Sequence, residues 1–259
     1  MAVLRCDFFS EALGLSTSMT VILPQQPFHN REVGEKFPTL YLLHGYSDDD
    51  TIWTRRTSIE RYVDGLGLAV VMPQVHHSYY TDMVHGHRFW TFLSEELPPV
   101  ARSFFNLSDK REDNFVAGLS MGGYGAFKWA FRQPEKFAAA ASLSGALDVV
   151  NTVEMMSQDD ARRKSFEHIF GNNKVAGTEN DLLWLLEQRK DSNMEMPKLY
   201  QCCGTEDFLY HQNVKFKELC EQTKLELTTS FSPGEHEWGY WDAKIQDVLK
   251  WLPIKAYDN

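Results

Sequence analysis

A serine stands in the middle of a glycine-rich hexapeptide, residues 118–123, with the sequence Gly-Leu-Ser-Met-Gly-Gly. A strand-like run, residues 114–117, precedes this segment, and a helix-like run, residues 124–130, follows it. A serine at the tip of a sharp strand-to-helix turn needs small neighbours two residues away on each side, because larger side chains would collide with the strand and the helix. Ser120 has a glycine at both positions, which makes it a candidate nucleophile for acyl transfer. An ordinary glycine-rich turn is the alternative.

A serine hydroxyl becomes a strong nucleophile when a histidine takes its proton and a carboxylate orients that histidine. After a turn of this kind, the acid and then the histidine follow in the chain, each on a loop after a later strand. The strand-like residues 198–203 are followed by the loop Gly-Thr-Glu-Asp, so Asp207 is the expected acid. Glu206 is the rival, and capping the next helix is the alternative task for Asp207.

His236 is the expected base, because it lies on the loop Ser-Pro-Gly-Glu-His after the last strand-like run. The other eight histidines lack the combination of a preceding strand, a glycine loop and a position after the acid. A single histidine is more often a surface or packing residue. Chain order and context favour the catalytic interpretation here.

The negative charge that develops on an attacked carbonyl oxygen needs backbone N–H donors. The turn at Ser120 would place the N–H of Met121 beside that oxygen, at the start of the following helix. A second donor is expected after the third strand-like run, where His44 and Gly45 are followed by Tyr46. The backbone N–H of Tyr46 is the candidate, and His44 is expected to orient this loop rather than to titrate.

Four aromatic residues fall near the loops expected at the active-site end of the sheet: Tyr46, Trp90, Trp238 and Tyr240. They are expected to wall a short acyl pocket. Core or surface packing is the alternative for each of them, because a sequence does not orient a side chain.

Metal and cofactor sites are not expected. Two histidine groups, residues 76–77 and residues 85–87, lack a supporting pattern of cysteines or carboxylates. The four cysteines have none of the spacings of zinc sites and are expected to be reduced, buried thiols.

Eight strand-like runs are expected, at residues 3–9, 16–23, 37–43, 68–72, 114–118, 138–143, 198–203 and 225–231. Helical patterns lie between the later runs, at residues 52–64, 90–105, 123–132, 213–222 and 238–252. The first two runs alternate polar and apolar residues like an antiparallel hairpin, whereas several later ones are continuously apolar. This order predicts an α/β fold with a mostly parallel eight-stranded sheet covered by helices on both faces.

One domain over residues 1–259 is expected, with an insertion at about residues 147–196. The insertion is rich in charged residues and methionine, and it carries helical patches at residues 161–170 and 181–190. A segment inserted between late strands usually forms a small helical cap over the active-site end of such a sheet. A surface crossover is the alternative.

Composition limits the partners. The chain has 259 residues, of which 43% are hydrophobic and 24% charged, enough for one large core. A net charge of -10 without a run of basic residues argues against nucleic acid or an anionic membrane as a partner. The chain shows neither a signal-like leader nor a membrane-length apolar run, so a cytoplasmic location is expected. A homo-oligomer formed through an edge strand or the cap remains open.

Given the loops that carry Ser120, His44 and Gly45, Asp207 and His236, the chain resembles the α/β-hydrolase superfamily, and within it the esterase D-like group. The resemblance covers nearly the whole chain and is greatest for the tributyrin esterase branch. It rests on Leu-Leu-His-Gly at residues 42–45, Trp-Thr-Arg-Arg-Thr at residues 53–57, Ser-Glu-Glu-Leu-Pro at residues 94–98 and the serine segment at residues 118–123.

That resemblance implies a serine carboxylesterase that hydrolyses short-chain acyl esters, with Ser120, Asp207 and His236 as the triad and a small-molecule ester as the substrate. Related S-formylglutathione hydrolases usually have a histidine at the position of Leu119 and Leu-Thr-Cys at residues 46–48, where this chain has Tyr-Ser-Asp. A thioesterase and an acetyl or feruloyl sugar-ester deacetylase would use the same machinery. A serine peptidase and a non-catalytic binding module are more distant alternatives.

Overall fold

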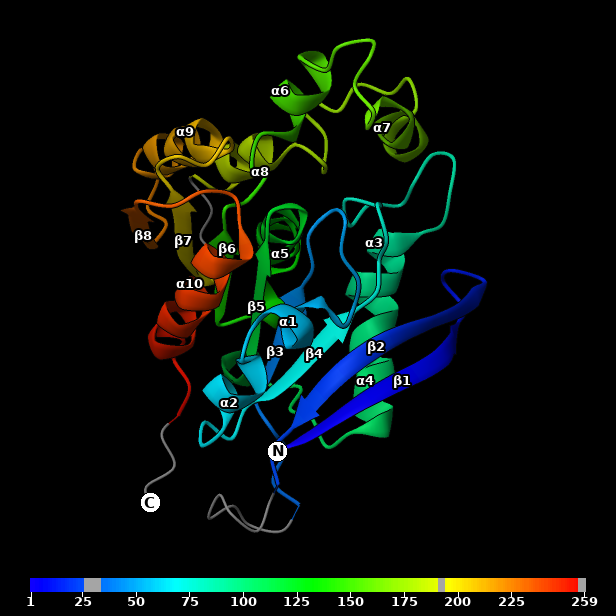
Figure 1. Ribbon diagram of the computed structural model, residues 1–259, viewed down its shortest axis with the longest axis vertical. Helices are drawn as coiled ribbons and strands as arrows, with labels where there is room; N and C mark the ends of the chain where they lie inside the picture. The colour runs from blue at the N-terminus through cyan, green and yellow to red at the C-terminus, as the bar shows by residue number, and fades with distance from the viewer. Residues whose placement is uncertain (26–33, 191–193, 256–259) are drawn as a thin grey trace.

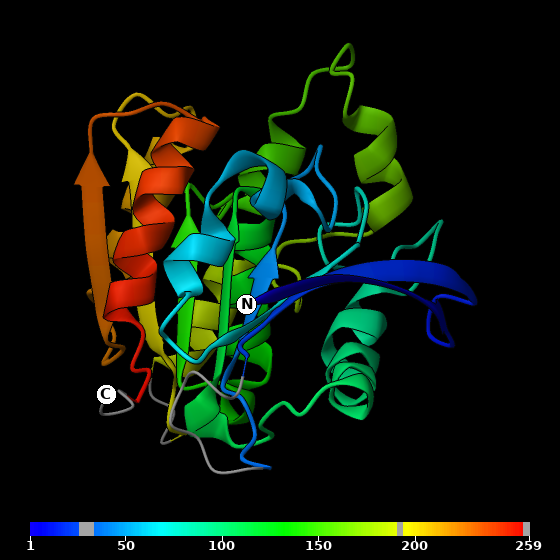
Figure 2. The ribbon, with the colours of Figure 1, turned by 60° about the horizontal axis from the view of Figure 1, so that its bottom comes forward.

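A single eight-stranded sheet runs through the molecule in the computed structural model, which describes residues 1–25, 34–190 and 194–255. The strand order is β1-β2-β4-β3-β5-β6-β7-β8, with β8 at one edge and the β1-β2 hairpin at the other (Figure 1, Figure 2). The strands are β1 (Ala2–Ser10), β2 (Leu15–Leu23), β3 (Thr39–Leu43), β4 (Ala69–Pro73), β5 (Asn114–Leu119), β6 (Ala139–Leu143), β7 (Lys198–Gly204) and β8 (Leu227–Ser232).

The sheet is mostly parallel. β1 pairs with β2 and β2 with β4 in antiparallel fashion, and the pairs from β4 through β3, β5, β6 and β7 to β8 are all parallel. The α/β-hydrolase fold that the sequence predicts is therefore confirmed, including the antiparallel hairpin at its start.

Helices cover both faces of the sheet. The α-helices are α1 (Ile52–Arg56), α2 (Ile59–Val63), α3 (Phe89–Thr91), α4 (Leu97–Phe104), α5 (Met121–Arg132), α6 (Val149–Glu154), α7 (Arg163–Phe170), α8 (Leu182–Arg189), α9 (Tyr210–Cys220) and α10 (Trp238–Trp251). Shorter pieces are the π-helical η2 (Phe92–Glu96) and the 3₁₀ turns η3 (Arg111–Asp113) and η4 (Pro134–Lys136).

Two of the predicted helices differ in detail. The helix expected at residues 52–64 is divided into α1 and α2, because Thr57 leaves the helical conformation. Its hydroxyl donates to the carbonyl of Trp53 and accepts from the N–H of Ile59, which replaces helical bonds at the break. The helix expected at residues 90–105 runs through α3, η2 and α4, with a π-helical turn in the middle.

Alternating strand residues divide the core into two clusters, one on each face of the sheet. In β3, Tyr41 and Leu43 belong to the cluster that contains α5, whereas Leu40 and Leu42 belong to the one that contains α10. Successive side chains of a strand point to opposite faces, so a strand buried on both faces must be apolar throughout. The central strands are held rigidly from both sides.

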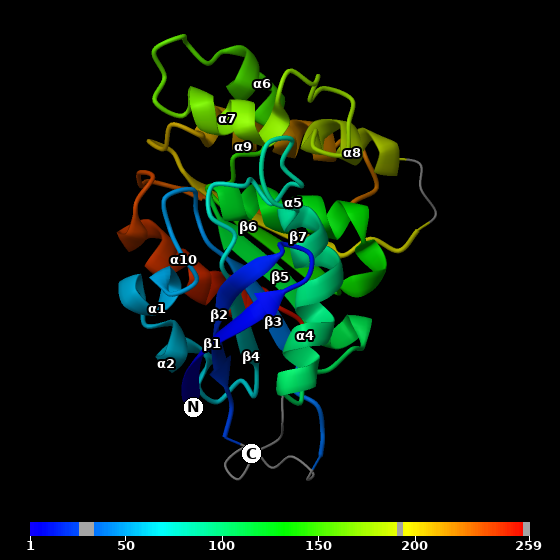
Figure 3. The ribbon, with the colours of Figure 1, turned by 90° about the vertical axis from the view of Figure 1, so that its right-hand side faces the viewer.

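Residues 147–196, expected as an insertion, contain α6, α7 and α8. Figure 1 and Figure 3 show α6 and α7 beyond one end of the sheet. Residues 191–193 of this segment lie outside the described residues. Over the described ranges, the helices are all too short or too polar to cross a membrane.

Candidate active site

Ser120 occupies a tight turn between β5 and α5. Its backbone has φ 53° and ψ -117°, a conformation that residues with side chains rarely adopt. A Cβ atom on Gly118 would lie 2.4 Å from the carbonyl oxygen of Gly122, and one on Gly122 would lie 2.5 Å from the carbonyl oxygen of Leu43. Both contacts are with backbone atoms that cannot move aside. The serine turn can therefore lie this close to β3 only with glycine at both positions.

The structure brings the three predicted side chains together from three separate loops. The Ser120 hydroxyl lies 3.0 Å from His236 Nε2, and His236 Nδ1 lies 2.8 Å from Asp207 Oδ2. These distances are ordinary for hydrogen bonds in which the serine donates to the imidazole and the imidazole donates to the carboxylate. The Asp207 side chain is fully buried, and 17% of the His236 side chain is exposed. The arrangement can pass a proton from the serine to the histidine.

The two neighbouring carboxylates in the acid loop have different tasks. Burial alone would raise the pKa of Asp207, but hydrogen bonds from His236 and from the backbone N–H of Leu209 outweigh burial, and the pKa is lowered. Glu206 is exposed and accepts a hydrogen bond from the backbone N–H of Gly234, so it ties the acid loop to the histidine loop. Asp207, and not Glu206, contacts the histidine.

Two aromatic rings that the sequence did not single out hold the histidine from its sides. The ring of Phe208 lies 4.5 Å from that of His236, and the ring of Trp241 lies 4.8 Å away in an edge contact. Phe208 is 68% exposed, an unusual position for a large apolar side chain. The sequence signal that could have identified Phe208 is its position directly after the predicted acid, Asp207.

The loop after β3 is fixed by the ring of His44. Nδ1 lies 2.7 Å from the carbonyl oxygen of Gly45, and Nε2 accepts from the backbone N–H of Val75 at 3.1 Å. Only the neutral ring can donate from one nitrogen and accept at the other. Complete burial lowers the pKa of His44 to about 4, which keeps the ring neutral. This loop presents Tyr46 to the pocket around Ser120.

Met121 begins α5, so its backbone N–H belongs to the first turn, whose N–H groups have no partner within the helix. This N–H directly follows Ser120. The N–H groups of Met121 and Tyr46 are the two that the sequence predicts as oxyanion donors.

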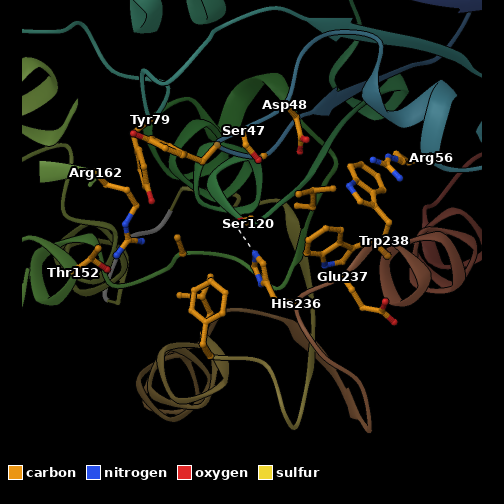
Figure 4. Close-up of a pocket in the computed structure, with 17 residues that line it drawn as sticks. Ser47, Asp48, Arg56, Tyr79, Ser120, Thr152, Arg162, His236, Glu237 and Trp238 are labelled. Atoms are coloured by element: carbon orange, nitrogen blue, oxygen red, sulfur yellow. Dashed lines mark hydrogen bonds between the residues drawn. The ribbon is translucent and has the colours of Figure 1, made fainter. Parts of the chain in front are cut away.

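Ser120 opens into a pocket of about 590 Å³. Figure 4 shows Ser120 and His236 between two groups of side chains, with Tyr79, Thr152 and Arg162 on one side and Asp48, Arg56 and Trp238 on the other. The lining combines charged side chains, among them Asp48, Arg56 and Arg162, with aromatic ones. Of the predicted pocket aromatics, Tyr46 and Trp238 line it.

The predictions for Trp90 and Tyr240 are wrong, since neither lines this pocket. Trp90 is buried in α3, where the guanidinium of Arg132 lies 3.9 Å from the centre of its ring. Tyr240 is buried in α10 against Gly234, where a Cβ atom would lie 2.4 Å from its ring. Both residues belong to helices whose inward faces point to the core, and the sequence alone did not reveal which way they face.

The segment from α6 to the start of α7 supplies pocket lining that the sequence analysis did not predict. Thr152 of α6 and Arg162, just before α7, both line the pocket. Arg162 forms two hydrogen bonds with the carboxylate of Asp160. This ion pair compensates much of the charge of the Arg162 guanidinium.

A second cavity of about 490 Å³ adjoins the first, with Asp48 lining both. Its lining includes five histidines: His76, His77, His85, His87 and His168. Within the part of the chain that the structure describes, no three His, Cys, Asp or Glu side chains are arranged to hold a metal ion. The four cysteines are free thiols, three of them buried.

Comparison with known proteins agrees with this geometry. Residues 10–252 match the Esterase family model, described as "Putative esterase". An acetyl esterase of Caldicellulosiruptor saccharolyticus is 28% identical over 262 residues, which span 97% of this chain and 98% of that protein.

Two solved structures from Staphylococcus aureus are similar over 97% of this chain and 98% of theirs. The fluorophosphonate-binding serine hydrolase FphF superposes with a TM-score of 0.88 at 37% identity. The S-formylglutathione hydrolase FrmB superposes with a TM-score of 0.85 at 38% identity. A ferulic acid esterase at 22% identity and a TM-score of 0.80 shares the fold.

Proposed function

Because the chain belongs to the Esterase family of α/β-hydrolases and is a serine carboxylic ester hydrolase, we propose that it hydrolyses short-chain acyl esters through an acyl-enzyme on Ser120. The observation that carries this proposal is the hydrogen-bonded series Ser120, His236 and Asp207, opening into a pocket of limited size. The serine Oγ attacks the ester carbonyl carbon while His236 Nε2 takes its proton. The leaving alcohol then receives that proton, and an acyl group remains on Oγ.

Water completes the cycle. His236 removes a proton from the attacking water, the acyl–Oγ bond breaks, and the proton returns to Ser120 as the carboxylic acid leaves. The N–H groups of Met121 and Tyr46 stabilise the oxyanion in both halves of the reaction. Asp207 stays ionised, which agrees with its lowered pKa, and stabilises the imidazolium form of His236.

The lining and size of the pocket support the proposed preference for short acyl groups. A volume of about 590 Å³ must hold both the acyl group and part of the alcohol, and charged residues share the lining with aromatic ones. A long alkyl chain would have to desolvate Asp48, Arg56 or Arg162, which is costly without a partner. The name of the acetyl esterase relative supports the same conclusion.

The test is hydrolysis of p-nitrophenyl esters from acetate to palmitate, and of tributyrin, by the wild-type protein and by Ser120→Ala. We expect the highest kcat/KM with acetate to butyrate, and a loss of at least about 10³-fold in kcat for Ser120→Ala. Labelling by a fluorophosphonate should disappear with the serine. Near-normal turnover by Ser120→Ala, or a maximum at palmitate, would contradict the proposal.

A thioesterase acting on S-formylglutathione is the second candidate, because FrmB is 38% identical over nearly the whole chain. The two functions share the acyl-enzyme and differ in the leaving group. We expect kcat/KM for p-nitrophenyl acetate to exceed that for S-formylglutathione, since Tyr46 and Leu119 stand in place of residues that are usual in those hydrolases. The reverse ratio would favour the thioesterase. Acetylated and feruloylated sugars belong in the same panel.

A further inference from the structure

Lys128 is a fully buried amine on the helix that follows the nucleophile. Its side chain is 0% exposed, and Nζ donates to the carbonyl oxygen of Tyr80 at 2.9 Å and to Thr81 Oγ1 at 2.8 Å. The centres of the Trp90 and Tyr124 rings lie 5.2 and 5.5 Å from Nζ. No described carboxylate forms an ion pair with it. A buried amine is costly unless it is hydrogen-bonded, and both of its hydrogen bonds go to the turn at residues 80–81.

The turn held by this lysine has an unusual backbone. Tyr79 and Tyr80 both have φ 49°, in the left-handed region that side chains disfavour. Ser78 supports the turn from within, because its hydroxyl accepts from the N–H of Tyr80 and its carbonyl accepts from the N–H of Thr81. Lys128 adds the external support, since it binds the carbonyl of one strained residue directly.

Tyr80 connects this turn to the loop after β3, which contains the expected oxyanion donor Tyr46. Its side chain is fully buried, and its hydroxyl donates to the carbonyl oxygen of His44 at 2.9 Å. His44 is two residues before Tyr46. The same carbonyl lies close to the serine turn, since a Cβ atom on Gly122 would be 2.7 Å from it. A continuous series of contacts therefore joins α5 to the loop on the opposite side of Ser120.

We propose that Lys128 and Tyr80 are positioning residues that fix the direction of the Tyr46 N–H toward the oxyanion. The inference rests on the proposed function and adds to it two residues that lie outside the pocket lining. An oxyanion donor is effective because it is already aimed at the place where charge develops. The Tyr80 hydroxyl holds the peptide before Gly45, and Lys128 prevents the strained turn from relaxing away.

The test replaces one hydroxyl. Tyr80→Phe keeps the ring and removes the hydrogen bond to His44. We expect kcat for p-nitrophenyl acetate to fall about tenfold with KM within twofold, because the donor acts in the transition state. The inhibition constant of an alkylboronic acid, which forms a tetrahedral adduct on the serine, should rise about tenfold. The concentration of active enzyme used to calculate kcat is the concentration that a fluorophosphonate labels, so unfolded protein is excluded.

Tyr124→Phe is the matched control. Its hydroxyl is also buried and donates to a backbone carbonyl, that of Asn180 at 2.7 Å, and its ring contacts the same lysine. Its hydroxyl also interacts with Thr81 of the turn, but it has no bond to His44. The losses in kcat and in boronate affinity should therefore be much smaller than in Tyr80→Phe, even if Tm falls. Lys128→Met removes the donor but keeps a similar volume. Combined with Tyr80→Phe in a double variant, it should lower kcat little beyond the loss that Tyr80→Phe causes alone.

Wild-type kcat and boronate affinity in Tyr80→Phe would overturn the inference, as would equal losses in Tyr80→Phe and Tyr124→Phe. The proposed function fails by a different result, namely a wild-type protein that hydrolyses none of the esters. Boronate affinity can also be measured as protection of Ser120 from fluorophosphonate labelling. That readout needs no ester, so it judges the positioning of the loop in either case.

Discussion

His236 is the residue on which the chemistry of this site depends. Both of its ring nitrogens are engaged, one by Ser120 and the other by Asp207, and aromatic rings lie within 5 Å on two sides. A ring held in this way keeps one tautomer and one orientation, so little reorganisation is needed when the proton moves. Phe208 shields it from water while remaining largely exposed itself.

The acid can be identified by exchanging each carboxylate for its amide. Asp207→Asn should lower kcat for p-nitrophenyl acetate by about 10³- to 10⁴-fold, because an amide can donate to Nδ1 and thereby favour the wrong tautomer. Glu206→Gln should lower it less than tenfold, because an amide oxygen can still accept from the backbone N–H of Gly234. Steady-state kinetics of the two variants distinguishes them. A larger loss in Glu206→Gln than in Asp207→Asn would show that Glu206, and not Asp207, is the acid.

At the scale of elements, the site depends on how closely α5 approaches β3. The first turn of α5 lies against the end of β3 with no room for a side chain at Gly122, where a Cβ atom would meet the carbonyl oxygens of Leu43 and His44. This contact sets the spacing between the two expected oxyanion donors, Met121 at the start of α5 and Tyr46 on the loop after β3. A mobile loop could not maintain such a distance.

Gly122→Ala should therefore be severely destabilising. The new methyl group would overlap two backbone carbonyls, so we expect a loss of about 3 kcal/mol or more in the free energy of unfolding, or failure to fold. Gly14→Ala is the control, because Gly14 has φ 68° but nothing within 4 Å of the added Cβ atom. Its strain should cost about 1 kcal/mol. Urea unfolding compares the two, and equal losses would show that close packing at Gly122 is unimportant.

At the scale of the whole molecule, the buried imidazole of His44 links folding to pH. Its pKa is lowered to about 4 in the folded protein, against about 6.5 in an unfolded chain. Between these values only the unfolded state binds the proton. The stability is therefore complete above about pH 6.5 and is lost as the pH falls toward 4, by about 3 kcal/mol in total.

The pH dependence is tested with His44→Gln, in which the amide oxygen can accept from the N–H of Val75. The variant should start less stable at pH 7 but lose about 3 kcal/mol less than wild type between pH 7 and pH 4. His211→Gln, an exposed position on α9, should keep the wild-type slope. Urea unfolding at several pH values gives both slopes. An unchanged slope in His44→Gln would mean that another group causes the acid sensitivity.

The sequence by itself determined the fold and the identities of the central site residues. Continuous apolar runs separated by helical patterns require strands covered on both faces, and glycines on both sides of Ser120 permit only a tight turn. Asp207 and His236 followed from chain order, because parallel strands deliver their following loops to one edge of the sheet. These inferences use local pattern and topology, which a sequence contains.

Tertiary structure alone decided the walls of the site and its internal support. Trp90 and Tyr240 are buried in helices away from the pocket, whereas Phe208 and Arg162 reach it. The contacts of Lys128 with Tyr80, and of Tyr80 with His44, join segments up to 48 residues apart. Side-chain direction and contacts of this kind depend on how helices rotate and pack against the sheet, and local periodicity does not specify that packing.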